Sequence, residues 1–355
     1  MEFNRGDIIY KYELIDRLGK GSFGEVWLAN DTLIDKRVAL KILPSSFGDI
    51  AKQLNEAKNG NKVSHKNLLT IYYADVVKIT EDHIVTLIAQ EFLKNGTIEN
   101  KLNAQNFLPL PDLIKVLTDI LLGLEYLHNG GVIHNDIKPS NILLDEYGNG
   151  ILADYGISCF SKDKKPIIAE SFYIIHGAPE TIGSTRQISI LTDIYQLGCT
   201  AYRLANGICE IKAEWQKDPE SFVEEKTKGK IPCNKHKKYV PKKLALIINK
   251  ALNVNPDKRF HSAIEMKHAI EKLHYPGYWT TNPENGTELI GYGLNYSYKY
   301  EVISKPNNLY DVNAYQINKT GRITKKTDFT KKNITQKDKE KILDAFFEWV
   351  MNNAK

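Results

Sequence analysis

The chain has 355 residues, of which 42% are hydrophobic and 26% are charged, and its formal net charge is +5. This composition excludes a disordered chain, allows two or three hydrophobic cores, and carries too mild a positive charge to indicate nucleic-acid binding. The apolar runs are too short to span a bilayer, no basic-then-apolar leader opens the chain, and the four cysteines are scattered, so we expect a cytoplasmic protein with reduced thiols.

The first motif is a glycine-rich turn between two expected strands. Residues 12–18 alternate in polarity, then comes Gly19-Lys-Gly21-Ser22-Phe23-Gly24, and a strand pattern resumes at Val26. The backbone N–H groups of such a turn can approach phosphates because no side chain stands in the way. Alone, the pattern fits a plain flexible hairpin about as well. The return to a strand argues against a dinucleotide-binding turn, in which a helix follows.

Three further segments complete the first part of the chain. Residues 37–43 read as a strand on which Lys41 shares a face with the small Ala39, and residues 50–58 as a helix that carries Glu56. A solvated Lys and a solvated Glu are the plain alternatives for these two residues. Residues 84–93 read as a buried strand that runs into a linker at 94–96.

A helix is expected from Asp112 to Asn129, because leucine, valine and isoleucine recur at helical spacing over this range. It leads into the stretch 132–156, in which two short apolar runs, 141–144 and 150–153, flank a turn at 146–149 with Gly and Asn. This pattern predicts a buried β-hairpin. A hairpin brings its two ends together, so the polar residues before and after it should meet.

The polar residues at the ends of this hairpin suit phosphoryl transfer. They are His134, Asp136, Lys138 and Asn141 before the first strand and Asp154 after the second. One carboxylate can accept the proton of an attacking hydroxyl, while a second carboxylate and an amide oxygen are hard ligands for Mg²⁺. The lysine can offset charge on the transferred phosphoryl group. Ordinary turn residues of a hairpin are the alternative.

These motifs resemble those of eukaryotic-like (Hanks-type) protein kinases. The run from His134 to Asn141 is similar to the kinase catalytic loop, and Asp154-Tyr155-Gly156 is similar to the metal-binding Asp-Phe-Gly motif. The resemblance covers about residues 12–274. It implies an α+β, bilobal protein-kinase fold, with a small β-rich N-lobe (about 1–93) and a large helical C-lobe (about 94–274), followed by an α+β C-terminal extension at 275–355.

The resemblance also implies a role for each site residue. Asp136 would orient the nucleophile, Lys138 would stabilise the transferring group, and Lys41, positioned by Glu56, would hold the α- and β-phosphates. Asn141 and Asp154 would bind Mg²⁺, with Mn²⁺ as the alternative. ATP would contact Gly19, Gly21, Ser22, Phe23, Gly24, Val26, Ala39, Lys41, Gln90, Glu91, Leu93 and Leu143. Within that set Phe23 would cap the phosphates, Gln90 would be the gatekeeper, and Glu91 and Leu93 would bond the adenine edge.

Three later residues have structural roles in the family, and two positions depart from it. Glu180, in Ala178-Pro179-Glu180, would pair with Arg259, and Asp193 would brace the catalytic loop. Asn135 replaces the family's usual Arg, which binds a phosphate on the activation loop, so we expect activity without that phosphorylation. Residues 172–177 replace the family's Gly-Thr, whose Thr ties the catalytic Asp to the Lys.

Residues 275–355 resemble no family that we recognise. Residues 286–304 and 308–324 alternate as antiparallel strands do, and Thr335 should cap a helix from Gln336 to Asn353 with an apolar stripe. A passive extension and a substrate- or partner-binding module are both open here.

We therefore expect an ATP-dependent protein kinase that phosphorylates protein hydroxyls, of Ser/Thr type by its Asp-x-Lys pattern, and that also modifies itself. The protein substrate is not indicated. The alternatives are a nucleotide-binding, pseudokinase-like scaffold that acts through its C-terminal module, and a kinase of a small molecule or of RNA.

Overall fold

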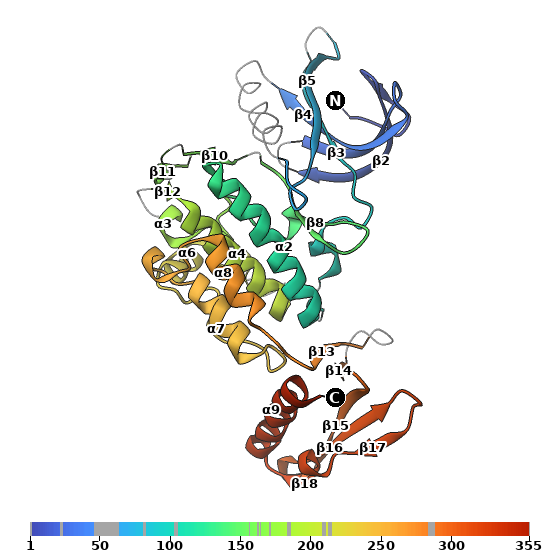
Figure 1. Ribbon diagram of the computed structural model, residues 1–355, viewed down its shortest axis with the longest axis vertical. Helices are drawn as coiled ribbons and strands as arrows, with labels where there is room; N and C mark the ends of the chain where they lie inside the picture. The colour runs from blue at the N-terminus through green and yellow to red at the C-terminus, as the bar shows by residue number, and fades with distance from the viewer. Residues whose placement is uncertain are drawn as a thin grey trace.

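The structure, a computed structural model, describes residues 2–354 except 22–23, 46–63, 81–82, 103–105, 156, 162, 164, 170–171, 183–185, 208–210, 212–214 and 283–287. Three parts follow one another along its long axis (Figure 1): a small lobe (residues 1–93), a large lobe (94–274) and a tail (275–355). Within the described part of the chain, no helix has both the length and the apolar character needed to cross a bilayer. The cytoplasmic location stays a prediction.

The small lobe is one curled antiparallel sheet. Its strands are β1 (Ile8–Ile9), β2 (Tyr12–Gly21), β3 (Gly24–Asp31), β4 (Lys36–Ser45), β5 (Ile71–Lys78) and β6 (Ile84–Glu91), in the spatial order β1-β2-β3-β4-β6-β5. Alternating residues such as Leu14, Leu40 and Leu87 form a core on one face. The strands predicted at 12–18 and 37–43 are confirmed, and the strand predicted at 84–93 is present but ends at Glu91. Residues 46–63, where the helix with Glu56 was predicted, lie outside the described residues.

The large lobe is built around two buried helices. Its helices are α2 (Leu110–Asn129), α3 (Pro179–Ile182), α4 (Ile190–Asn206), α6 (Pro219–Thr227), α7 (Lys242–Ala251) and α8 (Ala263–Glu271). α2 begins two residues before the predicted Asp112, because Pro111 fits the first turn of a helix, where an N–H has no helical partner. α4 is buried from Thr192 to Asn206, and the residues of α2 predicted to face the core are buried.

Short paired strands connect these helices. β7 (Val132–Ile133) pairs with β10 (Cys159–Phe160), β8 (Ile142–Leu144) with β9 (Gly150–Leu152), and β11 (Ile167–Ile168) with β12 (Gln187–Ile188). Single-turn 3₁₀ helices stand at Ile98–Lys101, Pro139–Asn141 and Pro256–Lys258. The predicted hairpin is therefore confirmed, as β8 and β9.

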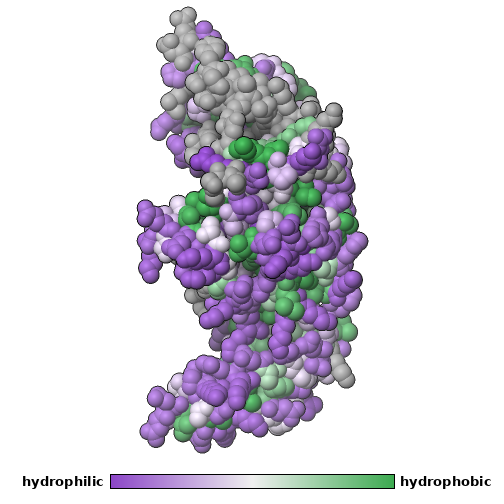
Figure 2. Space-filling model, turned by 90° about the vertical axis from the view of Figure 1, so that its left-hand side faces the viewer, coloured by the Kyte–Doolittle hydropathy of each residue, from purple (hydrophilic) through white to green (hydrophobic). Residues whose placement is uncertain are grey.

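The tail folds as an antiparallel sheet with one helix against it. Its strands are β13 (Tyr278–Thr281), β14 (Leu289–Tyr292), β15 (Tyr296–Lys305), β16 (Leu309–Asn318), β17 (Ile323–Lys325) and β18 (Lys331–Ile334). α9 (Gln336–Asn353) packs its apolar stripe on the sheet around the buried Trp279, whose indole N–H donates to Phe347 O at 3.2 Å. Thr335 caps α9, as predicted. The face of the tail seen at the bottom of Figure 2 is mostly hydrophilic.

The tail docks on the large lobe through shared aromatic residues. Tyr239 and Tyr275 pack against both the large-lobe core and the tail core, and the Tyr239 ring stacks on Phe107 with their centroids 3.7 Å apart. Lys238 pairs with Asp344 of α9 at 2.8 Å. That ion pair is exposed and adds little, so apolar contact supplies most of the docking energy.

Candidate functional site

The β8–β9 hairpin places the polar residues of the site. Ile142 is opposite Leu152, and Leu144 is opposite Gly150. The Asp145 carboxylate closes the turn by accepting hydrogen bonds from the backbone N–H groups of Tyr147 and Asn149, at 2.9 and 2.7 Å. The two ends of the hairpin are therefore held side by side, which brings the stretch 134–141 next to Asp154.

The Asp136 carboxylate is fixed through one oxygen and open at the other. Its Oδ2 accepts hydrogen bonds from Lys138 Nζ and Asn141 Nδ2, both at 2.8 Å. Asn141 Nδ2 also donates to the backbone oxygen of Asp136 at 2.8 Å. Asp136 Oδ1 is buried and has no hydrogen-bond partner among the described residues. A buried acceptor without a donor is costly, so this atom is suited to receive a hydroxyl from a bound molecule.

Lys41 and Asp154 join the two lobes at this site. Lys41 lies on β4 of the small lobe, and its Nζ is 3.1 Å from Asp154 Oδ1 at the end of the hairpin. Asp154 has a φ of 68°, in the left-handed region that a non-glycine residue rarely adopts. The surrounding structure must hold this conformation, which is common at functional sites. Glu56, the predicted partner of Lys41, lies outside the described residues.

Three of the residues predicted to contact ATP are partly buried apolar side chains that come from both lobes. Val26 is opposite Lys41 in the β3–β4 ladder, Ala39 is opposite Gln90 in the β4–β6 ladder, and Leu143 comes from β8. Val26, Ala39 and Leu143 are only partly buried, and Gln90 is buried. The arrangement offers apolar surface to a flat ring system placed between the lobes.

The linker and the glycine-rich turn border the same region. Glu91 N donates to Thr70 O at 2.9 Å, and Leu93 O accepts a hydrogen bond from Gly96 N at 3.1 Å. Gly24 has a φ of 154°, and a Cβ added there would stand 2.2 Å from Ile42 O, so the turn requires glycine. A Cβ on Gly19 would meet nothing within 4 Å. Gly21 ends β2, and the turn residues at 22–23 lie outside the described residues.

A polar stripe on the buried helix α4 holds the catalytic-loop backbone. Asp193 accepts hydrogen bonds from the backbone N–H groups of His134 at 2.9 Å and Asn135 at 2.8 Å, which confirms its predicted bracing role. One turn later, Gln196 donates to the backbone oxygen of Asn135 at 2.8 Å and accepts from Ile137 N at 3.0 Å. Asn135 has a φ of 65°. These bonds over-determine a backbone conformation that would otherwise be strained.

The next two turns of the stripe reach the activation segment, the stretch from residue 154 to residue 180. Thr200 Oγ1 donates to Ile137 O at 3.3 Å, and Arg203 Nη1 lies 2.8 Å from His176 Nε2. His176 Nδ1 is 3.0 Å from Ile137 O, so Nδ1 carries the proton and Nε2 accepts from the guanidinium. Burial, with the nearby Arg203 cation, holds the pKa of His176 well below its usual value. Arg203 also pairs with Glu99 at 3.0 Å.

A buried ion pair anchors the far end of the activation segment. Arg259 makes two parallel bonds to the Glu180 carboxylate, each at 2.7 Å, as predicted from the sequence. Lys226, which is fully buried on α6, donates to Ile175 O at 2.8 Å. Both cations fix backbone or side chains between residues 175 and 180.

Sequence reasoning missed Gln196, Thr200, Arg203 and His176 as parts of the site. A signal was present, because Asp193, Gln196, Thr200 and Arg203 follow one another at spacings of three or four residues on a helix whose other residues are mostly apolar or small. Such a stripe on a buried helix must meet polar partners.

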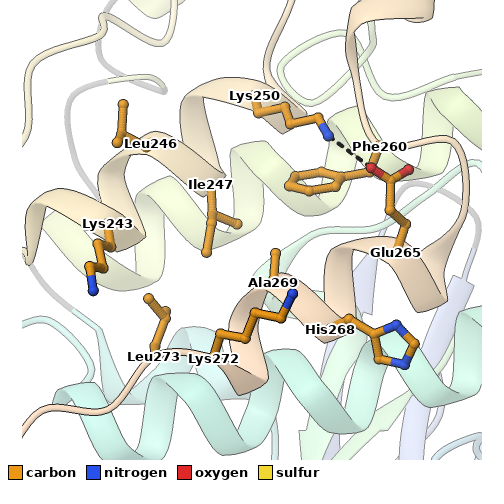
Figure 3. A pocket seen from close by; sticks show the side chains of 10 residues that line it. All are labelled: Lys243, Leu246, Ile247, Lys250, Phe260, Glu265, His268, Ala269, Lys272 and Leu273. Carbon is orange, nitrogen blue, oxygen red and sulfur yellow. Dashed lines mark hydrogen bonds and ion pairs between the residues drawn. The ribbon is translucent and has the colours of Figure 1, made fainter.

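A surface groove on the large lobe is separate from this site. Helices α7 and α8 line it with Lys243, Leu246, Lys272 and other residues, and Lys250 pairs with Glu265 across it at 2.8 Å (Figure 3). None of the predicted site residues lines this groove.

Comparisons with known proteins give one family model and several curated relatives. The family model described as the protein kinase domain matches residues 12–271. The chain is 28% identical over 300 residues to serine/threonine-protein kinase PknD of Chlamydia trachomatis, with 74% of this chain and 31% of the relative covered. It is 25% identical over 276 residues to PknB of Mycobacterium leprae and to PrkC of Bacillus subtilis, again over 74% of this chain, and over 43% and 40% of those relatives. The chain thus spans less than half the length of each of these relatives.

Proposed function

Because the chain belongs to the eukaryotic-like (Hanks-type) protein kinase family, we propose that it transfers the γ-phosphoryl group of ATP to serine and threonine hydroxyls of proteins. The observation that carries the proposal is the Asp136 carboxylate, which is fixed by Lys138 and Asn141 through Oδ2 and buried without a partner at Oδ1. The three relatives are all named serine/threonine-protein kinases, which supports the acceptor class.

At the acceptor, Asp136 Oδ1 would take the hydrogen bond of the incoming hydroxyl and accept its proton as the phosphoryl group is transferred. The hydrogen bonds from Lys138 and Asn141 to Oδ2 fix the orientation of the carboxylate for this role. Lys138 would stand beside the reacting oxygen and offset its negative charge.

At the nucleotide, Lys41 would hold the α- and β-phosphates, and in the structure its Nζ is kept in place by Asp154. Val26, Ala39 and Leu143 would sandwich the adenine, and the backbone at Glu91 and Leu93 would bond its edge. The roles of Gly19, Gly21, Gly24 and Gln90 follow the family pattern, and those of Glu56, Ser22 and Phe23 stay predictions on residues outside the described part.

Family members use a divalent cation with ATP, and the residues present fit one. The side-chain amide nitrogen of Asn141 donates hydrogen bonds to Asp136, so the amide oxygen of Asn141 is the atom that can bind a cation. Together with the Asp154 carboxylate this is a hard oxygen donor set. We propose that Asn141 and Asp154 hold Mg²⁺, or Mn²⁺ in its place, and that the bound ion neutralises phosphate charge.

The test is phosphate incorporation from γ-labelled ATP and Mg²⁺ into the chain itself and into a general acceptor such as casein. Asp136→Asn should lower the rate by roughly a hundredfold or more, while Asp112→Asn, at an exposed position in the first turn of α2, is the matched control and should not. Mass spectrometry should place the phosphates on Ser and Thr. Binding of ATP without phosphate transfer would indicate a pseudokinase-like scaffold. Incorporation of labelled phosphate only into added RNA or a small molecule would indicate a kinase of that class.

A partner site on the tail also stays a prediction. Pull-downs that compare the full chain with a chain truncated before Pro276 test it, and equal sets of bound proteins would make the tail a passive extension.

A further inference from the structure

The ring of Tyr173 lies over the ammonium of Lys138. Tyr173 lies in the activation segment between β11 and α3, and its ring centroid is 4.5 Å from Lys138 Nζ. The same Nζ donates to Asp136 Oδ2 at 2.8 Å, so the ammonium stands between a carboxylate and the face of an aromatic ring. The residue occurs in the stretch 172–177, which replaces the Gly-Thr that most kinases have here.

Local hydrogen bonds fix the position of this ring. Tyr173 O accepts from His176 N at 3.1 Å and from Gly177 N at 2.7 Å, which closes a tight turn. The rings of Tyr173 and His176 lie 5.9 Å apart, and His176 is bonded in turn to Ile137 O, the residue between Asp136 and Lys138. The turn therefore contacts the catalytic loop at two neighbouring residues, Ile137 and Lys138.

The Tyr173 ring can restrict the orientation of the Lys138 ammonium. A lysine ammonium is a point charge on a flexible stem with three rotatable donors, so a single bond to Asp136 leaves it several orientations. The negative face of an aromatic ring attracts a cation and removes some of these orientations. Burial raises the pKa of Tyr173, so the ring stays a neutral phenol at working pH.

We propose that Tyr173 is a positioning residue, whose ring holds the Lys138 ammonium against Asp136 and so takes over the task that a threonine has in most kinases. This inference rests on the proposed function. Tyr173 also packs against the large-lobe core, so an experiment must separate the ring's effect on Lys138 from its packing.

The first experiment measures steady-state kinetics of the full chain with ATP and casein. Tyr173→Leu keeps an apolar side chain but loses the ring, and we expect kcat to fall roughly tenfold while KM for ATP changes little. Tyr173→Phe keeps the ring and should stay within about threefold of wild type. Tyr147→Leu, at a tyrosine that is 77% exposed in the β8–β9 turn, is the matched control.

A double-mutant cycle makes the second arm. In a Lys138→Met background the ring has no ammonium to hold, so adding Tyr173→Leu should lower kcat by less than about twofold further. A fall in kcat as large as in the wild-type background would show that Tyr173 acts through packing alone, and would overturn the proposal.

Chemical labelling makes a third arm that needs no turnover. Acetylation of Lys138 by an N-hydroxysuccinimide ester, measured by mass spectrometry, should be several-fold faster in Tyr173→Leu than in wild type or Tyr173→Phe. The buried Lys226 reports unfolding, because its labelling stays low while the fold is intact. Unchanged labelling of Lys138 in a folded Tyr173→Leu chain would overturn the contact.

The outcomes separate this inference from the proposed function. If the wild-type chain transfers phosphate and Tyr173→Leu does so equally well, the positioning role is wrong and the kinase activity stands. If Tyr173→Phe is as slow as Tyr173→Leu, the hydroxyl and not the ring is responsible, and the proposal fails. If the wild-type chain does not transfer phosphate, the proposed function is wrong and the positioning role of Tyr173 in catalysis is wrong with it. Faster labelling of Lys138 in Tyr173→Leu would in that case support only the contact between the ring and the ammonium.

Discussion

Replacing Arg259 by Lys should destabilise the large lobe strongly, although the charge is conserved. The guanidinium is fully buried and uses all of its five N–H donors. Two go to the Glu180 carboxylate at 2.7 Å, and the others go to the backbone oxygens of Asn253, Leu191 and Val254 at 2.7, 2.9 and 3.2 Å. A lysine has three donors on a single atom, so at least two of these five acceptors must lose their partner.

The size of the effect follows from the lost bonds. Each buried acceptor left without a donor costs about 1–3 kcal/mol. Two such acceptors give a loss of about 2–6 kcal/mol for Arg259→Lys. For a unit of roughly 150–250 residues this lowers the melting temperature by about 10 °C.

Thermal melting of the full chain, followed by circular dichroism, measures this change. Arg17→Lys is the matched control, because Arg17 is half exposed and its contact with Glu25, at 3.9 Å, is long; it should change the melting temperature by less than about 2 °C. A melting temperature for Arg259→Lys within about 2 °C of wild type would refute the reasoning from donor geometry.

Three further predictions follow from the site and the tail. Asp193→Asn puts an amide in place of a carboxylate that accepts from two backbone N–H groups, and should lower kcat by roughly a hundredfold in the casein assay with little change in KM for ATP. Gly277→Ala would place a Cβ 2.4 Å from Val350 O, so α9 should separate from the sheet and hydrogen exchange of α9 should rise; unchanged exchange would contradict this. Burial lowers the pKa values of His134 and His176, so below about pH 6.5 the unfolded chain binds more protons than the folded one. As the pH falls below this value, the free energy of unfolding should therefore decrease by about 1 kcal/mol per pH unit for each histidine. The free energy of unfolding of a His176→Gln chain, measured by urea denaturation between pH 7.5 and 5.5, should depend less on pH than that of wild type.

The parts of the molecule that sequence predicted well are those whose signals are local. The β8–β9 hairpin, helix α2 and helix α9 each carry a clear apolar period with turn or cap residues at the ends. For the same reason the neighbourhood of Asp136, Lys138 and Asn141 could be predicted, since all three lie within six residues.

The parts that sequence did not predict depend on partners that are distant in the chain. β1 and β5 are short or mixed in pattern, and pairing with β2 and β6 makes them strands. The contact of Lys41 with Asp154 spans 113 residues. The polar stripe of α4 was visible as a pattern, but neither its periodicity nor its composition says that Arg203 meets His176.

The same difference in chain separation has a consequence for the order of folding. Contacts around Asp136 close loops of two to ten residues, as in the bonds to Lys138 and Asn141 and the pairing of Ile142 with Leu152. The hydrogen bonds that Asp193 accepts from the catalytic loop span 58 and 59 residues, and the bond between Lys41 and Asp154 spans 113. Closing a longer loop costs more entropy before any contact repays it. We therefore expect pulse-labelled hydrogen exchange to protect the hairpin first, the catalytic loop once α4 is in place, and the junction of the two lobes last. In a nascent chain Asp136, Lys138 and Asn141 would then be in place before Lys41 meets Asp154.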